Sequence, residues 1–181
     1  GLGAPLADFG YSSSGAVYIV LGNADFQNYS ASNPIDGFND LNLGLAAEQD
    51  VFVITNEVQN EQMGDDIAPA GDVNGDGVDD IIIGAPEASV FGLYGNRHGE
   101  AFIVFGSTDF TTDNAADDVL SGILEPDNLS PGEFFTIQGV SEIDNLSASV
   151  SGQFDFDDDG IDDVIVGSPL YDTNISNEGL S

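Results

Sequence analysis

Two short acidic segments hold the residues best suited to chemistry. They cover residues 72–80 (DVNGDGVDD) and 155–163 (DFDDDGIDD), and we call them the first and the second acidic loop. In both, side chains with oxygen atoms occupy loop positions 1, 3, 5 and 9, glycine occupies position 6, and position 7 offers a backbone carbonyl. This pattern suits a hard cation with about 6 to 8 oxygen ligands at roughly 2.3–2.6 Å, which favours Ca²⁺ over Mg²⁺.

Each acidic loop therefore predicts one calcium site. The predicted ligands of the first ion are Asp72, Asn74, Asp76, the carbonyl of Val78, and Asp80. Those of the second ion are Asp155, Asp157, Asp159, the carbonyl of Ile161, and Asp163. The remaining loop carboxylates are expected to face solvent or to support the ligands from outside: Asp79, Asp158 and Asp162.

An EF-hand is not expected at either loop. That motif places a bidentate Glu at position 12, where this sequence has Ile83 and Val166. It also requires flanking helices, whereas the flanks here have the short β-branched runs of strands. The alternative to a metal site is a pair of solvated acidic turns, which the recurrence of the loop with its spacing intact disfavours.

A repeat of just over eighty residues positions these loops. The triplets Gly3-Ala4-Pro5, Gly84-Ala85-Pro86 and Gly167-Ser168-Pro169 recur at intervals of 81 and 83 residues. Residues 72–86 aligned with 155–169 give 8 identities in 15 positions, and residues 15–26 aligned with 99–110 give 6 in 12. A repeat on this scale is the signature of an array or a propeller.

Short apolar runs bounded by Gly, Pro, Asn or Asp predict strands throughout the repeat. They lie at 16–21, 51–55, 80–83, 101–105, 134–137 and 163–166. Several are apolar at successive positions, which indicates strands that are buried on both faces. The antiparallel architecture that stacks small sheets at a fixed repeat is the β-propeller.

The spacing predicts four strands in a unit. A complete blade is expected over residues 59–140, with its strands near 63–71, 80–85, 100–105 and 134–139. Residues 1–58 are expected to hold strands 2 to 4 of a partial blade, and residues 141–181 strands 1 and 2 of another. A ring of 4 to 8 blades needs roughly 330 to 660 residues. We therefore expect a fragment or mature piece of a longer protein, or a chain that completes its blades with other chains.

The series from strand 1 through the acidic loop to Gly-Ala-Pro resembles the FG-GAP repeat of integrin α-subunit β-propellers and their bacterial extracellular relatives. The resemblance covers nearly the whole chain and implies bound Ca²⁺ at the acidic loops. In place of the Phe-Gly that names the repeat, the sequence has Met63-Gly64 and Leu146-Ser147. Segments 27–50 and 111–133, between strands 3 and 4, are longer than in the usual unit.

Composition excludes several classes of function. The chain has 33 Asp and Glu, a single Arg, no Lys and no Cys, so its formal net charge is −32. Nucleic acid and anionic membrane surfaces would repel it, and it has no apolar run long enough for membrane insertion. The lack of Cys excludes disulfides and thiolate zinc sites, and one His with one Arg leaves no catalytic triad. The charge excess fits a protein exposed to high salt, such as one of halophilic source.

The resemblance also indicates a ligand surface. In that family the loops between strands 2 and 3 lie opposite the calcium loops and often meet ligands, which here are residues 6–14 and 87–98. The second of these loops contains Phe91, Tyr94, Arg97 and His98. The alternative is a loop that packs its aromatic residues inward and pairs Arg97 with a neighbouring carboxylate.

We interpret the chain as a calcium-binding, non-catalytic β-propeller segment for adhesion or assembly, located outside the cell or at its surface. Its partners would be a protein or glycan ligand, or further copies of itself. Two alternatives stay open. One is the carbohydrate-binding propeller module of a secreted polysaccharide-active enzyme, and the other is a subunit of an extracellular filament.

Overall fold

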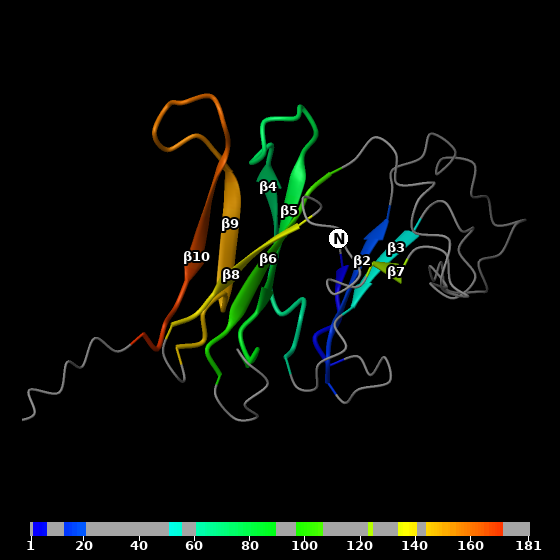
Figure 1. The fold of residues 1–181 in the computed structure, drawn as a ribbon. Coiled ribbons are helices and arrows are strands. Elements are labelled where there is room, and N and C mark those ends of the chain that lie inside the picture. Colours follow the sequence, from blue (N-terminus) through cyan, green and yellow to red (C-terminus); the bar gives the residue numbers. More distant parts are fainter. Residues whose placement is uncertain are drawn as a thin grey trace, which may run out of the picture.

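The computed structural model describes residues 2–6, 13–20, 51–55, 61–89, 97–106, 123–124, 134–140 and 144–171. Every regular element in these ranges is a β-strand, and the strands form three sheets (Figure 1). None of the described residues belongs to a helix of the length and hydrophobicity needed to cross a membrane. The all-β class expected from the sequence is therefore confirmed.

The middle sheet is the four-stranded antiparallel unit that the repeat predicts. Its strands lie in the order β4-β5-β6-β8, each antiparallel to its neighbours. They are β4 (Ile67–Gly71), β5 (Asp80–Ala85), β6 (Glu100–Val104) and β8 (Phe134–Gln138). β4 begins later than expected because the chain before it turns, with the Asp65 N–H donating to the Gln62 carbonyl at 3.2 Å.

The first sheet contains one strand that the sequence did not predict. Its order is β1-β2-β3-β7, and the first three strands are antiparallel neighbours. The strands are β1 (Leu2–Gly3), β2 (Ala16–Val20), β3 (Val51–Thr55) and β7 (Ile123–Leu124). β7 pairs in parallel with β3, although it comes from the long segment between β6 and β8. Two residues carry no periodicity, so a strand of this length leaves no pattern in the sequence.

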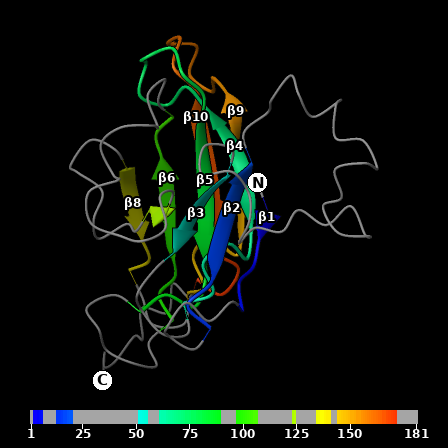
Figure 2. The ribbon, with the colours of Figure 1, turned by 90° about the vertical axis from the view of Figure 1, so that its right-hand side faces the viewer.

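The third sheet is a two-stranded antiparallel hairpin. It consists of β9 (Ser149–Phe154) and β10 (Asp163–Gly167), joined by the second acidic loop. Figures 1 and 2 show the hairpin on one face of the middle sheet and the first sheet on the other. The middle sheet is thus enclosed between two neighbours.

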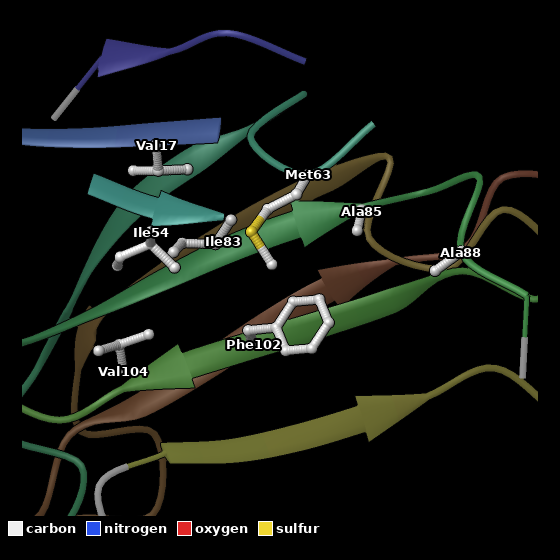
Figure 3. Close-up of a cluster of buried hydrophobic side chains, with 8 residues drawn as sticks. All are labelled: Val17, Ile54, Met63, Ile83, Ala85, Ala88, Phe102 and Val104. Carbon is white, nitrogen blue, oxygen red and sulfur yellow. The ribbon is translucent and has the colours of Figure 1, made fainter. Parts of the chain in front are cut away.

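The alternation of side chains along β5 and β6 sends apolar groups to both faces of the middle sheet. Ile83 and Phe102 point to the cluster shared with the first sheet, and Ile82 and Ile103 to the cluster shared with the hairpin. The successive apolar residues of these strands are therefore buried, apart from Ile81, which is half-buried. The buried members of the first cluster, drawn in Figure 3, are Val17, Ile54, Met63, Ile83, Ala85, Ala88, Phe102 and Val104.

Met63 and Ser147, which stand in place of the Phe and the Gly of the Phe-Gly pair, are both buried. Met63 is fully buried between the first and middle sheets, where its side chain extends toward Phe102 (Figure 3). A flexible thioether fills irregular core gaps and packs well against aromatic rings. Ser147 is also fully buried and has a positive φ of 70°. Its hydroxyl donates to the Glu100 carbonyl and accepts from the Ala85 N–H, so it joins β5 to β6.

Backbone hydrogen bonds join neighbouring units at equivalent places, and we call each of these joints a clasp. In the first clasp the Met63 N–H donates to the Ser14 carbonyl at 3.1 Å. In the second, one repeat later, the Leu146 N–H donates to the His98 carbonyl at 3.0 Å. The repeat therefore sets the joint between sheets as well as the sheets themselves.

Candidate metal centre

The two acidic loops lie side by side at one edge of the stacked sheets. The first loop connects β4 to β5 and the second connects β9 to β10, and both views show them at the same end of the molecule (Figures 1 and 2). Their proximity follows from the stacking, since β4 and β9 are the first strands of neighbouring units. The loops are at one edge because the same hairpin recurs in both units.

In the second acidic loop three carboxylates converge. Asp155, Asp157 and Asp159 each offer an oxygen, and these oxygens all lie within 4.8 Å of one another. All three residues are exposed. The loop is shaped by its own backbone, because Asp155 accepts the N–H groups of Asp159 and Gly160 at 3.0 and 2.7 Å. Its predicted ligands at positions 1, 3 and 5 are thus brought together.

The first acidic loop repeats the same local hydrogen bonds. Asp72 accepts the N–H groups of Asp76 and Gly77 at 2.9 and 2.8 Å. Asp76 Oδ1 accepts the Val78 N–H at 2.8 Å, as Asp159 Oδ1 accepts the Ile161 N–H at 2.9 Å in the second loop. Two sequences that differ at several positions therefore fold into the same turn.

Position 3 distinguishes the loops. In the first loop it is Asn74, whose amide nitrogen donates to Asp76 Oδ2 at 2.9 Å. In the second it is Asp157, a third carboxylate in the converging group. The second loop therefore concentrates more negative charge in the same space. We expect the stronger repulsion between its side chains to be offset by a bound cation.

The last predicted ligand of the first loop is buried. Asp80 is 1% exposed and accepts the N–H groups of Val73 and Gly106 at 2.9 and 2.7 Å. Burial raises the pKa of the Asp80 carboxyl, and the nearby charges of Asp76 and Asp72 raise it further, while the two backbone donors act in the opposite direction. In the second loop Asp163 takes the corresponding place and accepts the Phe156 N–H at 2.6 Å.

The donor set fits a hard divalent cation. Each loop supplies carboxylate oxygens at positions 1, 5 and 9, an amide or carboxylate oxygen at position 3, and a carbonyl at position 7. Oxygen-only ligands of this kind suit Ca²⁺ or Mg²⁺ and not the softer transition metals. The side chains at positions 1 and 5 now accept backbone N–H groups, and a carboxylate has lone pairs left for a cation.

The structure places the three supporting carboxylates differently from one another. Asp79 and Asp158 are exposed, whereas Asp162 is half-buried. Its Oδ2 accepts the Asp72 N–H at 3.0 Å, which joins the second loop to the first. Sequence spacing gives no signal for this contact, because it depends on how the two sheets stack.

The predicted ligand surface is described only in part. Phe91 and Tyr94 lie outside the described residues. Arg97 Nε lies 2.6 Å from Glu87 Oε2, so the pairing of Arg97 with a neighbouring carboxylate is observed. The Arg97 side chain remains 57% exposed. The adjacent His98 is half-buried, and its carbonyl forms the second clasp.

Comparison with known families identifies the repeat. Residues 63–101 match the model of the family described as the FG-GAP repeat. The chain contains an FG-GAP repeat. The match begins at the Met63-Gly64 pair, spans the first acidic loop and Gly84-Ala85-Pro86, and ends in β6. Together with the all-β fold, it shows incomplete FG-GAP propeller blades.

Comparison with known proteins finds integrin α-subunits among the relatives of this chain. It is 26% identical over 162 residues to Integrin alpha ina-1 of Caenorhabditis elegans, a match that covers 90% of this chain and 13% of that protein. It is 28% identical over 117 residues to Integrin alpha pat-2 of the same organism, covering 65% of this chain and 8% of that protein. The chain thus spans a small part of the length of both relatives.

Proposed function

We propose that this chain is a calcium-binding, non-catalytic β-propeller segment that serves adhesion or assembly outside the cell or at its surface. The observation that carries the proposal is the pair of acidic loops, which share spacing and backbone hydrogen bonds and lie at one edge of the sheets. The integrin α-subunits among its relatives support the adhesion role. The surplus of carboxylates supports a location where cations are abundant.

Calcium explains the burial of Asp80 better than a solvated turn does. A buried charged carboxylate costs free energy unless a counter-charge compensates it, and Asp72 and Asp76 add repulsion. A divalent cation bound in the loop would supply a counter-charge to Asp80, whose two oxygens accept the N–H groups of Val73 and Gly106. Ca²⁺ fits better than Mg²⁺ because the loop combines several carboxylates with a carbonyl, whereas Mg²⁺ keeps more of its water.

The test is calorimetric titration of the full chain with Ca²⁺. We expect two ions to bind, and Asp76→Ala to reduce the number to one because it removes a central ligand from the first loop only. Asp79→Ala is the matched control, since Asp79 is an exposed carboxylate of the same loop outside the ligand set. A stoichiometry of two in Asp76→Ala would place the coordination elsewhere, and the absence of binding would overturn the proposal.

We further propose that the units span residues 1–58, 59–140 and 141–181, and that another blade covers the outer face of the hairpin. Ile82 is fully buried by the hairpin, whereas Ile165, its counterpart 83 residues later, is 58% exposed. A sheet face of this kind is normally covered, and an open face recruits other chains. The covering blade would come from a longer polypeptide or a second copy.

Sedimentation of the chain in calcium tests this assembly role. We expect concentration-dependent association that Ile165→Asp weakens. Phe135→Asp is the control, because Phe135 is similarly exposed, at 56%, but lies on β8 of the middle sheet. Equal effects of the two variants, or a wild-type chain that stays monomeric at high concentration, would contradict the assembly role.

For adhesion we retain Phe91, Tyr94, Arg97 and His98 as proposed ligand contacts. A ligand with a carboxylate would have to compete with Glu87 for Arg97, and the exposure of the Arg97 side chain permits this. Arg97→Ala should reduce attachment of the chain to a protein- or glycan-coated surface without changing its melting temperature. Unchanged attachment would remove Arg97 from the ligand surface.

A further inference from the structure

The two acidic loops are joined through the residue that begins the first one. Asp162, in the second loop, accepts the Asp72 N–H on its Oδ2 at 3.0 Å and donates its own N–H to the Asp72 carbonyl at 3.2 Å. Both peptide groups that flank the Asp72 Cα are therefore engaged by a single residue of the neighbouring unit. Both residues are half-buried, so water competes less for these bonds than at a fully exposed site.

Packing supports the same joint. Gly71, which precedes Asp72, has a positive φ of 79°, and a Cβ added there would overlap the Asp162 carboxylate. Ile161, the residue before Asp162, lies next to Gly75 of the first loop. A Cβ added at Gly75 would be 3.7 Å from the Ile161 Cδ1, an ordinary van der Waals distance. The second loop therefore lies against the first on both sides of this joint, and at Gly71 only a glycine leaves room for the Asp162 carboxylate.

Asp162 also lies between two proposed ligands of its own loop. Ile161 would offer its carbonyl and Asp163 its carboxylate, so an ion in the second loop would fix the backbone on both sides of Asp162. Fixing Asp162 would in turn fix Asp72, the first ligand of the other ion. From Asp72 the ordering would pass to the rest of the first loop, because its carboxylate accepts the N–H groups of Asp76 and Gly77.

We propose that Asp162 is a positioning residue that couples the two cation sites, so that filling one acidic loop raises the affinity of the other. This coupling rests on the proposed calcium binding. Linkage makes it reciprocal, and couplings between sites are typically about 5- to 150-fold in affinity. Direct repulsion between two bound divalent cations acts in the opposite direction. A positive coupling therefore separates this mechanism from a purely electrostatic one.

The chain contains its own control for charge. Asp79 occupies position 8 of the first loop, as Asp162 does in the second, so the two residues are equivalent in the repeat. Asp79 is exposed, whereas Asp162 is half-buried against the first loop. Replacing either residue by Ala removes one negative charge close to the calcium loops. Only the replacement of Asp162 removes the side-chain acceptor of the Asp72 N–H, while the main-chain bond from the Asp162 N–H to the Asp72 carbonyl remains possible.

The first experiment measures the affinity of each loop separately in the full ¹⁵N-labelled chain. The amide resonances of Gly77 and Gly160 report on the two loops, since these N–H groups donate to the Asp72 and Asp155 carboxylates. Asp159→Ala disables the second loop by removing a central ligand. We expect it to weaken Ca²⁺ binding at Gly77 at least about fivefold, and to have no such effect when Asp162→Ala is already present.

Two further variants define the mechanism. Asp162→Asn loses the charge but keeps an oxygen that can accept the Asp72 N–H, so it should retain the coupling. Asp79→Ala should retain it as well. Coupling that persists in Asp162→Ala, or that is lost in Asp162→Asn or in Asp79→Ala, would overturn the role of the hydrogen bond.

A second measurement leaves the second loop intact and disables the first. In Asp76→Ala only the second loop can fill, and hydrogen exchange of the Asp72 N–H then reports on the joint directly. Calcium should slow this exchange in Asp76→Ala, but not in Asp76→Ala combined with Asp162→Ala. If both glycine resonances shift with calcium and neither loop affects the other, the coupling is wrong and calcium binding stands. If neither resonance shifts, calcium binding itself is wrong.

Discussion

The middle sheet and the β9–β10 hairpin have related sequences but very different surroundings. Ile82 of β5 is fully buried, while Ile165 of β10, the same residue type one repeat later, is 58% exposed. The difference arises because the middle sheet has neighbours on both faces, whereas the hairpin has a described neighbour on one. In a repeat protein, the burial of a residue is therefore decided by the next unit along and not by its own strand.

The largest expected effect comes from removing calcium, which we propose to bind in both regions. If calcium binds both acidic loops, each site contributes about 2.7 kcal/mol at a hundredfold excess of ion over its Kd. The loss of two sites should lower the melting temperature in EDTA by more than about 10 °C for a chain of this size. Thermal unfolding with and without EDTA measures this. An unchanged melting temperature would contradict a structural role for calcium.

The regions should also differ in how they respond to calcium removal. The hairpin has fewer buried contacts, so its amide groups should lose hydrogen-exchange protection before those of β5 and β6 do. Exchange that accelerates equally in the hairpin and in the middle sheet would show that the two unfold as one unit.

Truncating the two equivalent isoleucines tests the comparison directly. Ile82→Ala should cost about 2–5 kcal/mol of folding free energy, because it leaves a cavity between the middle sheet and the hairpin. Ile165→Ala should cost less than about 1 kcal/mol, since its side chain is mostly in water. Denaturant unfolding of the two variants at low concentration gives both values. A large cost at Ile165 would mean that its face is covered in solution.

The second residue of the Phe-Gly pair offers a further contrast between units. Gly64 and Ser147 are equivalent, and both have positive φ, 87° and 70°. Ser147→Ala should cost about 1–3 kcal/mol, because the buried Ala85 N–H and Glu100 carbonyl lose their partner. Ser147→Gly should cost less, since relief of the backbone strain offsets part of that loss. Equal costs would show that the hydroxyl bonds, and not the backbone, dominate at this position.

The smallest effect is expected where the loops meet the sheets. Val73 is half-buried and packs against the cluster between the middle sheet and the hairpin, whereas its counterpart Phe156 is 85% exposed. Val73→Ala should therefore destabilise the protein by about 1 kcal/mol. Phe156→Ala should change its stability by less than about 0.5 kcal/mol. Chemical denaturation measures both changes in stability. A larger effect at Phe156 than at Val73 would mean that Phe156 is the more buried residue of the pair.

Much of the fold could be predicted because each strand and each acidic loop is specified by a short run of consecutive residues. The apolar runs of β2, β3, β5, β6, β8 and β10 gave their strands to within one or two residues, and the spacing gave the four-stranded antiparallel sheet. The acidic loops could be located for the same reason, since a turn with its ligands lies within nine consecutive residues. These features depend on residues that are close together in the sequence, so one sequence is enough to predict them.

What could not be predicted depends on contacts between units. β7 is too short to leave a pattern, and its pairing with β3 joins Val53 to Ile123 across the sequence. The bond between Asp162 and Asp72 also spans 90 residues. Nothing in the spacing distinguishes Asp162 from the exposed Asp79. The exposure of Ile165 likewise follows from stacking, because its own strand resembles β5.

The clasps between units have a consequence for how such sequences diverge. Each clasp is a bond between backbone groups, so most side chains around it can change while the joint persists. The exceptions are Gly15 and Gly99, which have φ values of 89° and 78° and lie so close to the next unit that a Cβ would overlap the backbone of Met63 or Leu146. Gly15 and Gly99 thus constrain the two clasps, while the other side chains beside these backbone bonds can change without removing them.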